Sequence, residues 1–156
     1  MTTLLWSCPT LEIEMEELFE LKAYIEQQRY ADALALIGEM EEMSKDDKIH
    51  KIYSYAVILF LHLIKKNAEQ RSTRSWEFSI RNCVKEIKYI NKRRKAGGYY
   101  LSENELLETL EEAYQTALER AAIEAFEGQY DESQINSRVD KEVIKEEAFQ
   151  LIQGKS

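Results

Sequence analysis

Apolar residues recur at helical spacing along most of this chain of 156 residues. Side chains three and four positions apart form one apolar stripe in residues 10–29, another in residues 30–43 and a third in residues 73–95. No segment alternates between apolar and polar residues as a half-buried strand would. The pattern predicts an all-α protein, a bundle of about five to six mostly antiparallel helices.

The segment 45–69 differs from the other helical segments, because its second half, YAVILFLHLI at Tyr55–Ile64, is apolar on nearly every side. A helix of this kind is normally enclosed by other helices. We therefore expect it to be the central helix of the bundle. Ser44 resembles the cap of a helix, and Asp46 and Asp47 suit its first turn. We therefore predict that a separate helix begins after Ser44.

Glycines and helix-capping residues predict where the later helices end and begin. Gly97 and Gly98 predict the end of the helix over 73–95 and a loop after it. Ser102 and Glu105 have the spacing of a capping box, which predicts a long helix over residues 103–127.

A last helix is predicted over residues 140–152. The chain length fits a single helical domain over residues 1–156. Within this domain, the C-terminal segment 139–153 is expected to be a loosely packed helix.

Charge is distributed unevenly along the chain. The formal net charge is −8, yet residues 65–95 carry +8, residues 1–64 carry −7 and residues 96–156 carry −9. The overall acidity makes non-specific nucleic-acid binding unfavourable. The basic middle can still bind an acidic partner or the acidic helices of its own chain.

Cysteine usage and hydropathy indicate a cytoplasmic protein. Cys8 and Cys83 form no CxxC pair, so the sequence predicts neither a disulfide framework nor a zinc site. The longest apolar run is half the length of a membrane span, and we expect no membrane segment. We also expect no metal and no cofactor.

Several motifs resemble one bacterial family, largely cyanobacterial, known as domain of unknown function number 29. Its core motif is similar to HLIK at His62–Lys65, RSTRSW at Arg71–Trp76 and SIR at Ser79–Arg81. Its flanking patterns are similar to EMEEM at Glu39–Met43 and to the series Tyr114, Ala117, Ala121 and Glu124. The resemblance implies an all-helical fold and implies no activity.

His62 is the first candidate for chemistry. As a general base it would act with Glu41 or Glu124 and with Arg74. As a structural residue it would be a buried histidine hydrogen-bonded to a neighbouring helix. His50 lies twelve residues earlier, which is not a ligand spacing, so a metal site is not predicted. The structural interpretation is favoured.

Arginines follow His62 closely. A guanidinium pairs with a carboxylate in a planar fork, and the carboxylates most available to Arg71 and Arg74 are Glu39, Glu41, Glu42 and Glu124. We predict an inter-helix salt-bridge network in which Arg74 or Arg81 pairs with Glu124. Trp76 is predicted to anchor the start of the next helix in the core.

A basic stripe runs along the helix over 73–95. It consists of Arg74, Arg81, Lys85, Lys88 and Lys92. Three interpretations of the stripe are open. It is a solvated face, it pairs with the acidic flanks of the chain, or it binds an acidic protein or nucleic acid. The candidate binding residues are Arg71, Arg74, Arg81, Lys85 and Lys88.

Three functions are compatible with this sequence. The leading prediction is a small cytoplasmic interaction or regulatory protein without catalysis, which binds another protein or a second copy of itself. The second is a hydrolase or nuclease that uses His62, a glutamate (Glu41 or Glu124) and Arg74. The third is nucleic-acid binding through the basic segment 71–95. The sequence contains no P-loop, GxSxG or HExxH motif that would indicate a particular enzyme class.

Overall fold

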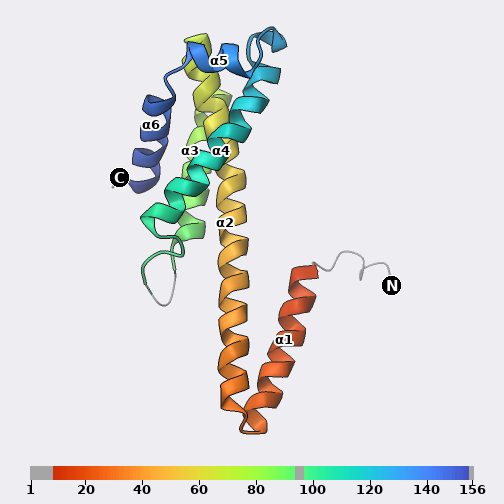
Figure 1. Cartoon of the computed structure of the whole chain (residues 1–156). Helices are drawn as coiled ribbons and strands as arrows, with labels where there is room; N and C mark the ends of the chain where they lie inside the picture. The colour runs from red at the N-terminus through yellow and green to blue at the C-terminus, as the bar shows by residue number, and fades with distance from the viewer. Residues whose placement is uncertain (1–8, 94–96, 155–156) are drawn as a thin grey trace. The chain divides into compact units, whose positions relative to one another are not determined.

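The computed structural model describes residues 9–93 and 97–154, with side chains from residue 15 onward. Within these ranges the chain forms six α-helices, one 3-10 helix and no β-strand, which confirms the all-α prediction (Figure 1). The elements are α1 (Pro9–Glu26), α2 (Tyr30–Glu69), α3 (Arg74–Asn91), α4 (Glu103–Glu124), η2 (Ala125–Gly128), α5 (Glu132–Arg138) and α6 (Lys141–Gln153).

The chain divides into two compact units, residues 1–46 and residues 47–156. Unit 1 contains α1 and the beginning of α2, and unit 2 contains the remainder of α2 and all later helices. A single domain over the whole chain stays a prediction.

The prediction that a new helix begins after Ser44 is wrong, because α2 is one helix of 40 residues. The acidic pair after Ser44 has the composition of a first turn, but a helix start also requires the previous helix to stop. No glycine or proline follows Gly38 before the end of α2. The intervening Glu, Met and Lys residues are good helix formers, and a single serine costs too little to interrupt them.

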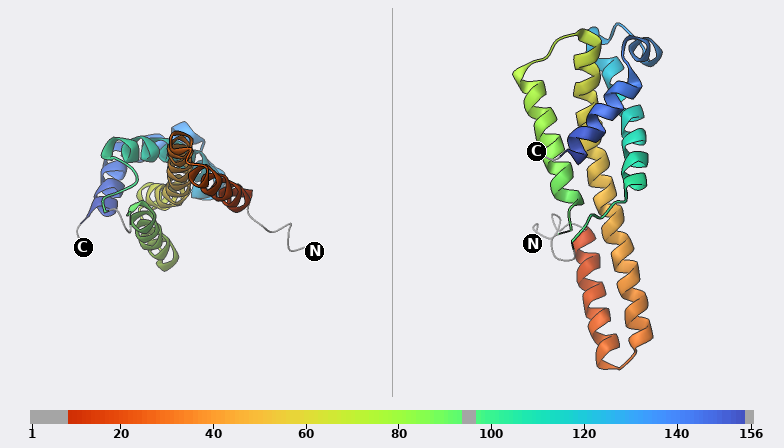
Figure 2. Two further views of the ribbon diagram at one scale, coloured as in Figure 1. Left: turned by 90° about the horizontal axis from the view of Figure 1, so that it is seen from below. Right: turned by 90° about the vertical axis from the view of Figure 1, so that its left-hand side faces the viewer.

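Unit 1 is a helical hairpin, in which α1 and the start of α2 lie side by side (Figure 2, right). The turn between them uses Gln28 with a positive φ of 61° and ends with the backbone N–H of Arg29 donating to the carbonyl of Tyr24. The Arg29 guanidinium then pairs with Asp32 in the first turn of α2, at 2.9 Å.

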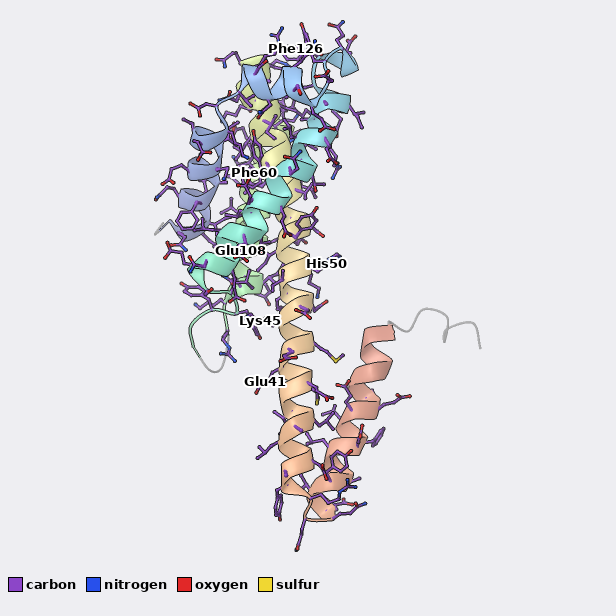
Figure 3. All side chains as sticks on the ribbon, viewed as in Figure 1. Glu41, Lys45, His50, Phe60, Glu108 and Phe126 are labelled. Atoms are coloured by element: carbon purple, nitrogen blue, oxygen red, sulfur yellow. The ribbon has the colours of Figure 1, made fainter. Side chains whose placement is uncertain are left out.

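The second half of α2 supplies the centre of unit 2. Ile52, Leu59 and Phe60 are fully buried there. The Phe60 ring meets the ring of Tyr114 on α4 edge to face, with centroids 5.5 Å apart (Figure 3 labels Phe60). The apolar run of the sequence is therefore the core helix that its hydropathy predicts.

The start and the end of α3 have different causes. Thr73 caps its start by accepting a hydrogen bond from the Trp76 N–H. Its end is Asn91, whose carbonyl accepts from the Tyr100 N–H and whose buried side chain accepts from the Leu101 N–H at 2.9 Å. The predicted end at the glycine pair 97–98 is thus several residues late. Those glycines form the loop itself, both with φ above 70°.

The start of α4 is the predicted one, since Ser102 and Glu105 form a complete capping box. The helix ends at Glu124, three residues before the predicted end, and η2 follows with Phe126 and Glu127 in the left-handed region. Gly128 closes the turn with φ 76°.

Helix α5 was not predicted. It spans seven residues and begins with a capping box made by Asp131 and Gln134. That spacing was a visible signal, but seven residues are too few for a recognisable apolar stripe.

Helix α6 packs against α3 and α4. Ile144, Ala148 and Ile152 form its buried stripe. Two lysines near its start, Lys141 and Lys145, pair with Glu111 on α4.

Candidate functional site

A hollow with an apolar floor lies between α3 and α6. We call it the α3–α6 groove, and its volume is about 550 Å³. Ile80, Val84 and Leu151 provide apolar lining, and Arg81, Lys85 and Lys88 provide cationic lining; Gln150 and Gly154 complete it. The groove therefore combines apolar surface with three formal positive charges.

The amphipathic pattern of α3 produces this combination. Ile80, Cys83 and Ile87 are buried, and they hold α3 on the core. Arg81 and Lys85 lie on the exposed side of the same helix. An acidic or amphipathic ligand can contact both surfaces at once.

Lys88 fixes one end of the groove. Its ammonium donates a hydrogen bond to the carbonyl of Gly154, just beyond the last turn of α6, at 3.1 Å. A cation is favourable there, because the last carbonyls of a helix have no partners within the helix. The sequence-predicted binding residue Lys88 therefore also ties α3 to α6.

Two further hollows continue the surface along α3. One, of about 500 Å³, lies at the start of the helix, where Arg74, Glu77 and Phe78 are among its lining residues and Arg81 is shared with the groove. The other, also about 500 Å³, lies near the end of the helix and shares Lys88 with the groove. Four of the five predicted binding residues, Arg74, Arg81, Lys85 and Lys88, thus line one continuous α3 surface.

Sequence reasoning missed two aromatic residues on this surface. Phe78 is 63% exposed and Tyr89 is 59% exposed. Phe78 comes four residues after Arg74 and Tyr89 four residues after Lys85, so each lies one turn further along the basic stripe. That spacing was the signal which could have identified them.

The fifth predicted binding residue, Arg71, belongs to a different place, the junction between α2 and α3. Its guanidinium lies 4.7 Å from the Trp76 ring centroid, and the Lys65 ammonium lies 4.8 Å from the same centroid. Arg71 also pairs with Glu69 at 3.1 Å. Trp76 is only partly buried, and it is held by two cations at the edge of the core.

A hollow of about 470 Å³ opens beside this junction. Three of its lining residues are carboxylates, Glu69, Glu124 and Glu127, and two are cations, Lys65 and Arg71; Trp76, Phe126 and Gln129 complete it. Both cations are already paired, Lys65 with Glu124 and Arg71 with Glu69, which is typical of a structural network.

The predicted partner of Glu124 is wrong. Glu124 pairs with Lys65 at 3.6 Å and not with Arg74 or Arg81. Its side chain is 42% exposed, whereas the Lys65 side chain is 12% exposed. The prediction relied on the stronger pairing geometry of arginine, but Lys65 on α2 is the cation that meets this part of α4.

The predicted hydrogen bond from His62 to a neighbouring helix is not formed by its Nδ1 atom. That atom is buried and has no hydrogen-bond partner among the residues that the structure describes. The ring lies 6.4 Å from Trp76, centroid to centroid. Burial, followed by the charge of Lys65, lowers the pKa of His62, so the neutral imidazole is favoured.

Among the four hollows described above, none is lined by more than one of the four catalytic candidates. Glu41 is exposed on the portion of α2 that belongs to unit 1. Arg74 lines the hollow at the start of α3, and Glu124 lines the junction hollow. His62 lines neither of these two, although the charge of Glu124 acts on it.

Residues 15–93 and 97–154 contain no group of three or more His, Cys, Asp or Glu side chains placed to hold a metal ion. Burial raises the pKa of Cys83 to about 11, which keeps its thiol protonated. Cys8 lies outside the described residues. Among the helices in these ranges, none is long and apolar enough to cross a membrane.

The chain was compared with protein families, curated proteins and solved structures. A family model described as a domain of unknown function, DUF29, matches residues 15–147. No curated protein and no solved structure matches the chain.

Proposed function

The chain belongs to the DUF29 family, a domain of unknown function, and from that premise we propose that it is a protein-interaction module without catalytic activity. The α3–α6 groove is the proposed binding site. The proposed partner is an acidic amphipathic segment of another protein, and the proposed setting is the cytoplasm.

The observation that supports this proposal is the pairing of an apolar floor with a cationic rim in one groove. Ile80 and Lys88 are eight residues apart, so the groove follows α3 for about 12 Å, or two helical turns. A helix that lies in such a groove anchors through apolar residues at helical spacing. Acidic residues beside those anchors would meet Arg81 and Lys85, which would favour rapid association and the correct orientation.

The arrangement of the catalytic candidates favours binding over catalysis. General acid–base chemistry needs its groups within hydrogen-bond reach of one reacting position. Arg74 and Glu124 line different hollows, and His62 lines neither. The proposal therefore assigns no chemical step to these residues.

The test is a binding titration with a fluorescein-labelled helical peptide that has leucines on one face and glutamates on the other. We expect the full chain to bind this peptide, and Lys85→Glu to weaken binding on the order of tenfold through charge repulsion at the rim. Lys51→Glu is the matched control, because Lys51 is an exposed lysine of unit 2 outside the groove. Equal loss in both variants, or no binding by the parent chain, would refute the proposal.

A second candidate function rests on Phe78 and Tyr89. Exposed aromatic rings beside Arg74, Arg81 and Lys85 provide stacking surfaces next to phosphate-binding charges, as single-stranded nucleic acids require. A labelled oligothymidylate is the probe. Binding that weakens steeply with salt and is lost in a Phe78→Ala/Tyr89→Ala variant would favour this function. Binding of the acidic peptide alone would favour the leading proposal.

A further inference from the structure

Unit 1 exposes an apolar stripe along α1. Four large apolar side chains on this helix are about half exposed or more: Met15 (50%), Leu18 (52%), Phe19 (66%) and Ile25 (49%). Their separations of three, four, seven and ten residues place them on one side of the helix. An exposed apolar row of this kind marks an interaction surface.

The hairpin has little core of its own. Among the described side chains of unit 1, Ala33 and Leu36 are the buried apolar ones. Tyr30 and Leu34, at the start of α2, are 59% and 69% exposed. Two helices cannot cover all of their apolar side chains, and a third or fourth helix normally completes such a layer.

The charge of the hairpin restricts what that additional helix can be. Residues 1–46 contain 11 acidic and 3 basic side chains, a formal charge of −8, whereas residues 47–156 contain 18 of each. Lys22 pairs with Glu26 at 3.9 Å and Arg29 pairs with Asp32 at 2.9 Å. The acidic side chains therefore greatly outnumber the cations that could neutralise them.

Two of these carboxylates lie directly beside the apolar stripe. Glu16 follows Met15 and Glu20 follows Phe19, so the two glutamates form a row one residue away from the stripe and four residues apart. Both are exposed. An apolar row bordered by carboxylates is complementary to a helix that has an apolar face bordered by lysine or arginine.

We infer that the exposed side of α1 is a docking surface for a basic amphipathic helix of a partner protein. Leucine-like side chains of the partner pack on Leu18 and Phe19, and its cations pair with Glu16 and Glu20. The occupant is not a second copy of the same hairpin, because a symmetric contact would bring together two segments that each carry a formal charge of −8. This surface is separate from the α3–α6 groove and does not depend on the function proposed for that groove.

The probe is a fluorescein-labelled peptide of 18 residues with leucines on one helical face and lysines on the other, titrated with the full chain. An otherwise identical peptide with glutamates in place of the lysines is its control. We expect the basic peptide to bind and the acidic peptide not to bind at this surface. We also expect the affinity for the basic peptide to fall as salt is raised, since the attraction between the charges is screened.

Two variants locate the binding. Phe19→Ser removes the most exposed apolar side chain of the row, and Glu16→Lys/Glu20→Lys reverses its acidic border; each should weaken binding on the order of tenfold or more. Glu108→Lys/Glu112→Lys is the matched control, because these exposed residues are also four apart, on α4 of unit 2. Circular dichroism checks that all three variants keep their helix content.

Three outcomes would overturn the inference. One is a failure of the basic peptide to bind the full chain, and another is the same affinity in the Glu16→Lys/Glu20→Lys variant as in its control. The third is a dimer in sedimentation velocity that Phe19→Ser converts to a monomer, which would make a second copy the occupant. Lys85→Glu should leave binding of the basic peptide unchanged, so failure here is distinguishable from failure of the groove proposal.

Discussion

Substitution by glycine should raise the free energy of unfolding at Glu127 and lower it at Glu112, because the backbone conformations of these two residues differ. Glu127 lies in the left-handed region, with φ 57° and ψ 31°, and it is exposed. For a residue with a Cβ this conformation costs about 1–2 kcal/mol, a cost that glycine avoids. Glycine in turn loses about 0.5–1 kcal/mol through its greater freedom in the unfolded chain. Glu127→Gly should therefore raise the free energy of unfolding by about 0.5–1 kcal/mol.

Glu112 provides the matched comparison. It is exposed in the middle of α4, and Glu112→Gly removes the same carboxylate from a residue with helical backbone. Glycine costs about 1 kcal/mol in a helix interior. The two variants have the same net charge, and their free energies of unfolding should differ by about 1.5–2 kcal/mol. Phe126 is also left-handed but is unsuitable, because its ring packs edge to face on Tyr130 at 5.1 Å.

The assay is urea denaturation followed by tryptophan fluorescence in a Trp6→Phe background, so that Trp76 in unit 2 is the reporter. The slope of the free energy against urea should be the same for both variants, which makes the difference one of stability. Equal destabilisation by Glu127→Gly and Glu112→Gly would refute the reasoning. It would mean that residue 127 does not hold a strained conformation in solution.

Three further predictions concern the core, a helix cap and a histidine. Phe60→Ala should destabilise unit 2 by about 3–5 kcal/mol in urea denaturation, because a fully buried ring and its contact with Tyr114 are lost. A loss below about 1 kcal/mol would contradict the packing. Ser102→Ala should cost about 1 kcal/mol in the same assay, since the Glu105 N–H loses its acceptor, and no change would argue against the cap. The pKa of His62 is lowered in the fold, chiefly by burial, so the unfolded chain binds the proton more tightly. The free energy of unfolding should then fall as the pH drops from about 7 to about 5, and His62→Gln should reduce that slope; parallel pH profiles would contradict this.

The local elements were largely predictable from the sequence. In the capping box at Ser102, the apolar core segment at Tyr55–Ile64 and the basic stripe from Arg74 to Lys92, each residue lies within two helical turns of the next one in the pattern. Spacing within a helix determines which of its sides is apolar, and the sequence contains that spacing directly. The cationic half of the α3–α6 groove was predictable for the same reason.

Relations between helices were not predictable in this way. The continuity of α2 through Ser44, the pairing of Glu124 with Lys65, and the meeting of Leu151 with Ile80 and Val84 in one groove became known only from the structure. Periodicity shows that a side of a helix is apolar, but it does not show which neighbour covers that side or leaves part of it open. The sequence by itself thus determined an all-α chain with one basic helix, and packing between the helices decided where that helix presents a groove.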